Sequence, residues 1–295
     1  MRYSRIKRNQ TKKRYATFLL VVLLGFAVIY VAFAGTLGKF VSNLILPLIS
    51  SENKNNTGNN DDDPVLTIPD TTEEPSKDTA KVTETLKANA LTMYAIQMNA
   101  FSDKSNAEAF AQELKSKGGA GYILDDGFYR VIAIGFKNEQ DAKQVREELK
   151  ADGIESHVYK IATAGANMSI TATRDNVSAI SSAYELWEEK YYSLEDIILN
   201  LDKGNISSSE AYNNIKEIKT ELEAKRDQLK ELYDNQNNNN IVLAGLVTLY
   251  ENSCLSLDKI LSINSMDKVA ISSEIKYTYV DMLMQYMDYM EQITK

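Results

Sequence analysis

The chain has 295 residues, enough for two small domains with additional segments, and its formal net charge of −8 is unevenly distributed. Residues 1–15 carry seven lysines and arginines and no acid, whereas the remainder is acidic on balance, which argues against a nucleic-acid partner. A single cysteine, Cys254, excludes an internal disulfide, and a single histidine, His157, leaves a zinc site short of its usual ligands. We therefore expect no catalytic residue, no metal and no cofactor.

The first predicted element is a membrane span. Residues 16–34 form an apolar run without charge or proline, and as a helix it would nearly cross the ~30 Å core of a bilayer. By the positive-inside rule, the basic residues predict a cytoplasmic tail over 1–15, a transmembrane helix over 16–38 and an extracytoplasmic C-terminus. A cleaved signal peptide is the rival interpretation, because residues 32–34 (AFA) fit a signal-peptidase site. The apolar run exceeds the usual h-region, which favours a single-pass anchor in the cell membrane.

Residues 39–90 are predicted to be a juxtamembrane segment followed by a disordered linker. Residues 40–49 are apolar, but polar residues and Pro47 interrupt them, so they are too short for a second span. Residues 51–90 contain three of the chain's four prolines, many acidic and amide residues and no aromatic residue. Such a composition cannot build a hydrophobic core, which favours a tether.

Residues 91–162 alternate predicted strands and helices. In four segments, apolar residues either alternate with polar ones or form short runs bounded by turn signals, which is typical of strands. In two further segments, apolar residues recur every three or four positions, which is typical of helices. The order βαββαβ predicts an α+β, ferredoxin-like fold, with both helices on one face of a four-stranded antiparallel sheet. The strands are expected over 94–101, 120–124, 128–134 and 155–162, and the helices over 105–117 and from about 139 to 152.

The other face of this sheet is predicted to stay open, and open faces of this fold commonly bind ligands. Strand alternation decides which side chains lie on each face. The open face is expected to carry Gln97, Phe128, Arg130, Ile132 and Tyr159. The face toward the helices is expected to carry Met98, Tyr129, Val131 and Val158.

Three stretches of this segment carry a family pattern: YAIQMNAFSDKSNAEAFAQELKSKG, DDGFYRVIAIGFKNEQDAKQVREELKADGI and HVYKI. In order and spacing they resemble the SPOR (sporulation-related repeat) family of bacterial membrane proteins. The resemblance covers residues 91–162. It implies binding to septal peptidoglycan, with a preference for glycan strands stripped of their stem peptides.

The resemblance also implies a set of glycan-binding residues. Gln97 matches the family's first-strand glutamine, whose amide both donates and accepts hydrogen bonds. Phe128 stands where the family places an aromatic ring that can stack on a sugar. Arg130 matches an arginine that could bond glycan oxygens or a lactyl carboxylate, and Tyr159 flanks the groove. The alternative is that the two rings only cover a partly exposed sheet and that Arg130 is a solvated charge.

The sequence departs from the family pattern at two places. Asn99-Ala100 stands where the family often has Gly-Ser, which removes one hydroxyl from the expected binding surface. The stretch Ile134-Gly135-Phe136 lacks the frequent Gly-Pro step.

Residues 174–294 are predicted to form an antiparallel four-helix bundle. Apolar residues of the first helix alternate spacings of three and four, as in a heptad seam. The third helix, about 241–262, contains charged and polar residues, so we interpret it as a core helix and not as a second span. The fourth carries a stripe of Met and Tyr that either fills the core or forms a groove for a partner. The seam consists of Val177, Ile180, Tyr184, Trp187, Tyr191, Leu194, Ile198 and Leu201.

Three functional hypotheses follow from the sequence. The first is a non-catalytic envelope protein that the SPOR-like segment targets to septal or spore-associated glycan, in cell division or sporulation. Its bundle would recruit a protein partner or self-associate. The second is a cell-wall hydrolase, or an activator of one, with a SPOR targeting module. The third is an oligomerisation device in which the heptad seam pairs chains as a coiled coil.

Overall fold

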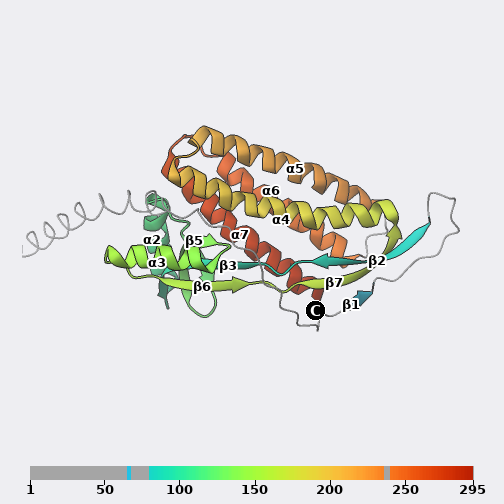
Figure 1. Cartoon of the computed structure of the whole chain (residues 1–295), viewed down its shortest axis with the longest axis horizontal. Helices are drawn as coiled ribbons and strands as arrows, with labels where there is room; N and C mark the ends of the chain where they lie inside the picture. Colours follow the sequence, from blue (N-terminus) through green and yellow to red (C-terminus); the bar gives the residue numbers. More distant parts are fainter. Residues whose placement is uncertain (1–64, 68–79, 236–239, 295) are drawn as a thin grey trace, which may run out of the picture.

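The structure, a computed structural model, describes residues 65–67, 80–235 and 240–294. The basic tail over 1–15, the transmembrane helix expected over 16–38 and much of the expected linker lie outside the described residues. The described part is a mixed α+β architecture, in which two β-sheets and two short helices lie beside four long helices (Figure 1).

The βαββαβ order predicted for residues 91–162 is confirmed. The unit forms a four-stranded sheet in the order β4-β5-β3-β6, and every neighbouring pair of strands is antiparallel. Asp103 and Asn138 begin the two helices, since each side chain accepts a hydrogen bond from a first-turn backbone N–H. The elements are β3 (Thr92–Phe101), α2 (Lys104–Ser116), β4 (Tyr122–Asp125), β5 (Tyr129–Phe136), α3 (Glu139–Ala151) and β6 (His157–Ala162).

A second sheet was not foreseen from the sequence. It contains β1 (Val65–Thr67), β2 (Lys81–Ala88) and β7 (Ala166–Thr173) in the order β1-β7-β2. The prediction of a disordered linker is therefore wrong for residues 65–67 and 81–88. Alternate residues of β7 are buried, so one face of this sheet packs on the molecule while the other faces solvent. Such a sheet needs apolar residues on one face only, and its strands are therefore less apolar than fully buried ones.

The two sheets are joined by a long two-stranded ribbon. β2 leads into β3, β6 leads into β7, and the ladder keeps one register from Lys81↔Thr173 to Gln97↔His157. Between the two sheets, Leu91 N donates to Thr163 Oγ1 and Thr163 N donates to Leu91 O, both at 2.9 Å. One backbone bond and one bond to a side chain thus join the two segments between the sheets, so the βαββαβ unit is attached through two continuous strands.

Four long helices form an antiparallel bundle in which each helix packs on two neighbours, α4 on α5 and α7, and α6 on α5 and α7. Every residue of the predicted heptad seam of α4 is buried inside the chain. That seam is therefore not available to pair two chains as a coiled coil, which contradicts the oligomerisation hypothesis in that form. The helices are α4 (Arg174–Lys203), α5 (Ser208–Asn235), α6 (Ile241–Leu261) and α7 (Lys268–Thr294).

Helix α6 is the one described helix that is long and apolar enough to cross a membrane by length and composition. Most of that helix, 61% of the window, is buried inside the molecule. It packs between α5 and α7, as a core helix does. Its cysteine, Cys254, is buried, and burial raises the pKa of the thiol to about 11.

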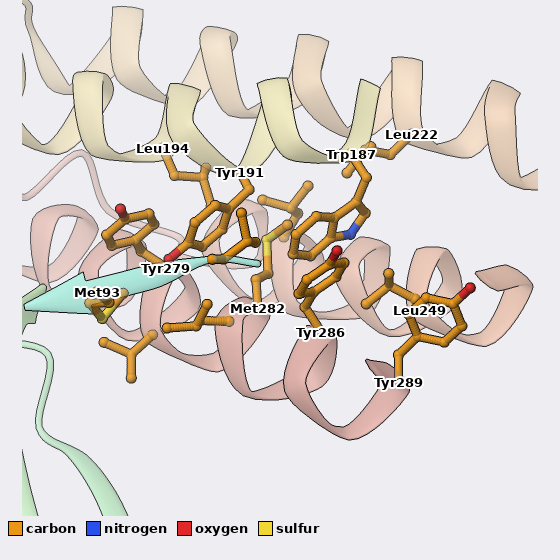
Figure 2. Close-up of a cluster of buried hydrophobic side chains, with 14 of the residues drawn as sticks. Met93, Trp187, Tyr191, Leu194, Leu222, Leu249, Tyr279, Met282, Tyr286 and Tyr289 are labelled. Atoms are coloured by element: carbon orange, nitrogen blue, oxygen red, sulfur yellow. The ribbon is translucent and has the colours of Figure 1, made fainter. Parts of the chain in front are cut away.

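Aromatic rings fill the seam between α4 and α7 (Figure 2). Tyr191 stacks on Tyr279 with ring centroids 4.6 Å apart, and Trp187 stacks on Tyr286 at 4.9 Å. Trp187 and Tyr191, both on α4, stack on each other at 5.4 Å, so the continuous stack has two α4 rings in the middle and one α7 ring at each end. Such pairs stabilise a core beyond the area they bury. The Met and Tyr stripe of α7 thus fills the core along this seam.

Stability is expected to fall steeply above about pH 10, because burial raises the pKa of Tyr191, Tyr279 and Tyr289 well above 10. The stability that these buried neutral phenols contribute is complete below the pKa of an unfolded tyrosine. It is lost as the pH rises from that value toward the higher folded-state pKa, at about 1.4 kcal/mol per pH unit for each tyrosine. Burial lowers the pKa of Lys276, which opposes this trend only below the ordinary lysine pKa. Urea midpoints measured between pH 8 and pH 11 would test the expectation.

The matched variant for this test is Tyr191→Phe, which removes one of the buried ionisable phenols; burial also raises the pKa of Tyr184, Tyr250 and Tyr286. Its slope of stability against pH above pH 10 should be smaller than that of the wild type by about 1.4 kcal/mol per pH unit, the share of one tyrosine. A urea midpoint that stays constant up to pH 11 would show that these phenols do not control alkaline stability.

Candidate functional site

The bundle covers part of the sheet face that the sequence analysis expected to be open. Met93 and Ala95 alternate with Gln97 along β3, so they lie on the same face, yet both are fully buried. Helix α7 contacts α2, β4 and β5, and Met93 belongs to the same buried cluster as Tyr279 (Figure 2). The expectation of a fully open face is therefore wrong at this end of the sheet. Ile132, expected on the open face, is also fully buried.

A buried ion pair fixes the bundle to the loop after α2. Nζ of Lys276 lies 2.6 Å from Oδ2 of Asp202, and the two side chains are 0% and 1% exposed. The same Nζ donates to the carbonyl of Gly118 at 2.8 Å, and Ser273 Oγ donates to the carbonyl of Gly119 at 2.8 Å. Two residues of α7 thus satisfy backbone acceptors of the βαββαβ unit. This contact places the unit rigidly on the bundle.

A second contact involves the end of β5. The carboxylate of Glu195 accepts hydrogen bonds from Lys137 N at 3.0 Å and from the Tyr279 hydroxyl at 3.1 Å. Burial raises the pKa of this carboxyl. The ammonium of Lys137 lies 3.7 Å from the centroid of the Tyr192 ring, within the range of a cation–π contact.

The other end of the sheet face is accessible at Asp126 and Phe128, and a polar cluster lies there. Gln97, which was expected on the open face, is only 6% exposed and lies at the base of this cluster. Nε of Arg130 donates to both carboxylate oxygens of Asp126, at 2.9 and 2.8 Å. Nη1 of Arg130 donates to Oε1 of Gln97 at 3.1 Å, and the Tyr159 hydroxyl donates to Asp126. With Phe128, these side chains are called the Arg130 cluster below.

Two aromatic rings flank the guanidinium of Arg130. Its Cζ lies 4.8 Å from the centroid of the Tyr159 ring and 5.8 Å from that of Phe128, both within cation–π range. Phe128 is 51% exposed, which is unusual for so large an apolar side chain. An exposed flat ring beside hydrogen-bonding groups is suited to stack on the apolar face of a sugar ring.

Local backbone features place these side chains. Gln97 lies at an irregularity of the β3–β5 ladder, where the register shifts on both sides of it. The β3–β6 ladder keeps one register through Gln97, so this side chain stays on the face of Met93 and Ala95. Gly127 has φ +98°, a conformation that glycine adopts without strain, and it forms the tip of the β4–β5 hairpin. The hairpin turn brings Asp126 back over Arg130.

The cluster is electrically balanced in this structure. Hydrogen bonds from Arg130 and Tyr159 hold the pKa of Asp126 below its usual range, so its carboxyl stays ionised at neutral pH. The hydrogen bond to Asp126 in turn raises the pKa of Tyr159, so its hydroxyl stays protonated. The charge of Arg130 is thus neutralised before any ligand arrives.

The structure brings the four sequence-predicted residues, Gln97, Phe128, Arg130 and Tyr159, to one place. Asp126 belongs to the same place, although the DDG sequence around it predicts only a hairpin turn. An acid and an arginine four residues apart across a tight hairpin turn were the signal that could have identified the pair.

Comparison with known proteins agrees with the resemblance noted in the sequence. Residues 90–160 match the family model described as the SPOR domain. This segment is a SPOR domain. A solved structure that is similar to it is the solution structure of the peptidoglycan binding domain of the B. subtilis cell wall lytic enzyme CwlC. The two are 28% identical over 24% of this chain and 90% of that chain, with a TM-score of 0.21.

No curated protein matches the chain. The SPOR domain is therefore the one part of the chain that these comparisons assign. In the structure it comprises β3 to β6 with α2 and α3, and the strands β2 and β7 continue β3 and β6 toward the bundle.

Proposed function

We propose that this chain is a membrane-anchored, non-catalytic protein that binds peptidoglycan glycan strands through the Arg130 cluster of its SPOR domain. The single observation that carries the proposal is the exposed ring of Phe128 beside the half-buried side chains of Arg130 and Tyr159 at one end of the SPOR sheet, where the buried Gln97 accepts a hydrogen bond from Arg130. Amide, guanidinium and aromatic groups are the groups that recognise sugar hydroxyls and ring faces.

The ligand we propose is glycan stripped of its stem peptides, at the septum or around the spore, in cell division or sporulation. The apolar run over 16–34 after a basic tail supports a single-pass anchor with the SPOR domain outside the cytoplasm. A helical bundle packed against the SPOR domain then presents a second surface beyond the membrane, for a protein partner or for self-association. The alternative is a cell-wall hydrolase, or an activator of one, that uses the SPOR domain for targeting.

Sedimentation with peptidoglycan sacculi tests the proposal. We expect the purified full chain to be retained by sacculi whose stem peptides an amidase has removed, and less by untreated sacculi. Arg130→Ala and Gln97→Ala should each weaken retention by about tenfold, because the first removes donors to the ligand and the second removes the acceptor that positions Nη1 of Arg130.

The matched control is Arg146→Ala, which removes an arginine from the outer surface of α3, where it pairs with Glu147. This variant should bind like the wild type. Lack of retention by both preparations would reject glycan binding, and equal weakening by Arg146→Ala would show that only net charge matters.

A further inference from the structure

We propose that Asp126 makes the Arg130 cluster selective for uncharged sugar groups, such as hydroxyl and acetamido oxygens, over a glycan carboxylate. The inference rests on the proposed glycan binding and specifies the ligand chemistry of that same site. It follows from the hydrogen bonds that Arg130 already makes and from the charge that lies beside it.

A guanidinium binds a carboxylate best through two parallel N–H donors. The side-on pair of donors in arginine consists of Nε and Nη2, and in Arg130 the Nε is bonded to both oxygens of Asp126. The end-on pair consists of Nη1 and Nη2, and here Nη1 is shared with Oε1 of Gln97. An incoming carboxylate would have to displace Asp126 to use the side-on pair. A hydroxyl or carbonyl oxygen needs only one donor and can use the N–H groups that remain.

The charge of Asp126 acts in the same direction. The side chains of Arg130 and Asp126 are only 23% and 28% exposed, so solvent screens them incompletely. A ligand carboxylate that reached the guanidinium would lie close to the carboxylate of Asp126 and be repelled by it. The carboxyl of Asp126 keeps this charge at mildly acidic pH, because its hydrogen bonds lower its pKa.

The rest of the cluster favours an uncharged ligand as well. Phe128 presents an exposed ring, and Tyr159 forms the opposite wall of the guanidinium. Glycan stripped of stem peptides carries both kinds of group, since each N-acetylmuramic acid then has a free lactyl carboxylate. This protein thus recognises the N-acetylhexosamine backbone, and the lactyl carboxylate does not increase its affinity.

Binding of two probes to the full chain tests this. One probe is soluble glycan from amidase digestion, which bears lactyl carboxylates, and the other is chitohexaose, which bears none. The wild type should bind both. Asp126→Asn should tighten binding of the amidase-treated glycan by about fivefold at low salt, with a smaller gain at high salt. Binding of chitohexaose should change by less than about twofold, because asparagine keeps the acceptor oxygen for Nε.

The matched control is Asp125→Asn, which makes the same charge change one residue earlier. Its side chain accepts a weak hydrogen bond from Gly127 N and does not contact Arg130 in the described structure. This variant should alter neither affinity by more than about twofold. If the wild type binds both probes and Asp126→Asn leaves their ratio unchanged or weakens the amidase-treated glycan, the selectivity role is wrong and glycan binding stands. If the wild type binds neither probe, glycan binding and the selectivity built on it are both wrong.

Discussion

The Lys276→Met variant is expected to lower the free energy of unfolding by about 3–5 kcal/mol. Lys276 is fully buried, and its Nζ lies 2.6 Å from Oδ2 of Asp202. Methionine fills much of the same volume but carries no charge. The buried Asp202 carboxylate then keeps its hydrogen bond from Ser272 Oγ, at 2.6 Å, and loses its only described cation partner. The carbonyl of Gly118 also loses its donor, so the attachment of the SPOR domain to the bundle should weaken. Urea unfolding followed by far-UV circular dichroism at pH 7 measures the loss.

Two further variants make this test specific. Adding Asp202→Asn to Lys276→Met should recover more than half of the lost stability, because the unpaired buried charge disappears while Ser272 keeps an acceptor. Lys259→Met changes an exposed lysine on α6 and should alter stability by no more than about 0.5 kcal/mol. A single Lys276→Met variant as stable as the wild type would contradict the role of the buried pair.

The Trp187→Ala variant is expected to lower the free energy of unfolding by about 3–5 kcal/mol. Trp187 is 1% exposed and lies between the rings of Tyr191 and Tyr286 in the α4–α7 seam. Alanine leaves a cavity there and removes both ring contacts. It also removes the hydrogen bond from Nε1 of Trp187 to Ser253 Oγ, at 2.9 Å. Trp187 is the only tryptophan of the chain, so unfolding should be followed by circular dichroism and not by tryptophan fluorescence.

Trp187→Phe separates packing from hydrogen bonding. Phenylalanine keeps one aromatic ring in the stack, so this variant should lose clearly less than the alanine variant. Leu255→Ala removes a large apolar side chain that is 61% exposed and should change stability by no more than about 0.5 kcal/mol. Equal losses for the phenylalanine and alanine variants would show that the hydrogen bond, and not the packing of rings, dominates at this position.

Much of the candidate site was predictable because Gln97, Arg130 and Tyr159 lie on strands. The two-residue period of β3, β5 and β6 assigned Gln97, Arg130 and Tyr159 to one face, and the structure brings them together. Asp126 was not predictable in the same way. The sequence DDG is typical of a tight turn for purely local reasons, so it does not indicate that Asp126 also binds Arg130. That role exists only because the hairpin folds Asp126 over Arg130 while β6 brings Tyr159 from elsewhere in the chain.

The second sheet was missed for a related reason. β2 has few apolar residues and follows a segment rich in proline and acid, so its local composition is typical of a linker. Its strand conformation depends on β7, which pairs with it from Lys81↔Thr173 to Ala88↔Ala166. The local sequence of neither segment shows that the two pair with each other. Alternating burial in β7 shows that the pattern was present but too short to identify alone.

By itself, the sequence determined the elements whose causes are local. These are the βαββαβ order, the helix caps and the four long amphipathic helices, because caps and hydrophobic periodicity act over a few residues. The tertiary structure decided how these elements meet. It closed part of the SPOR sheet face against α7, joined the sheets through one continuous ribbon and buried Lys276 beside Asp202. These features depend on contacts between segments far apart in the chain, whose energies no local pattern encodes.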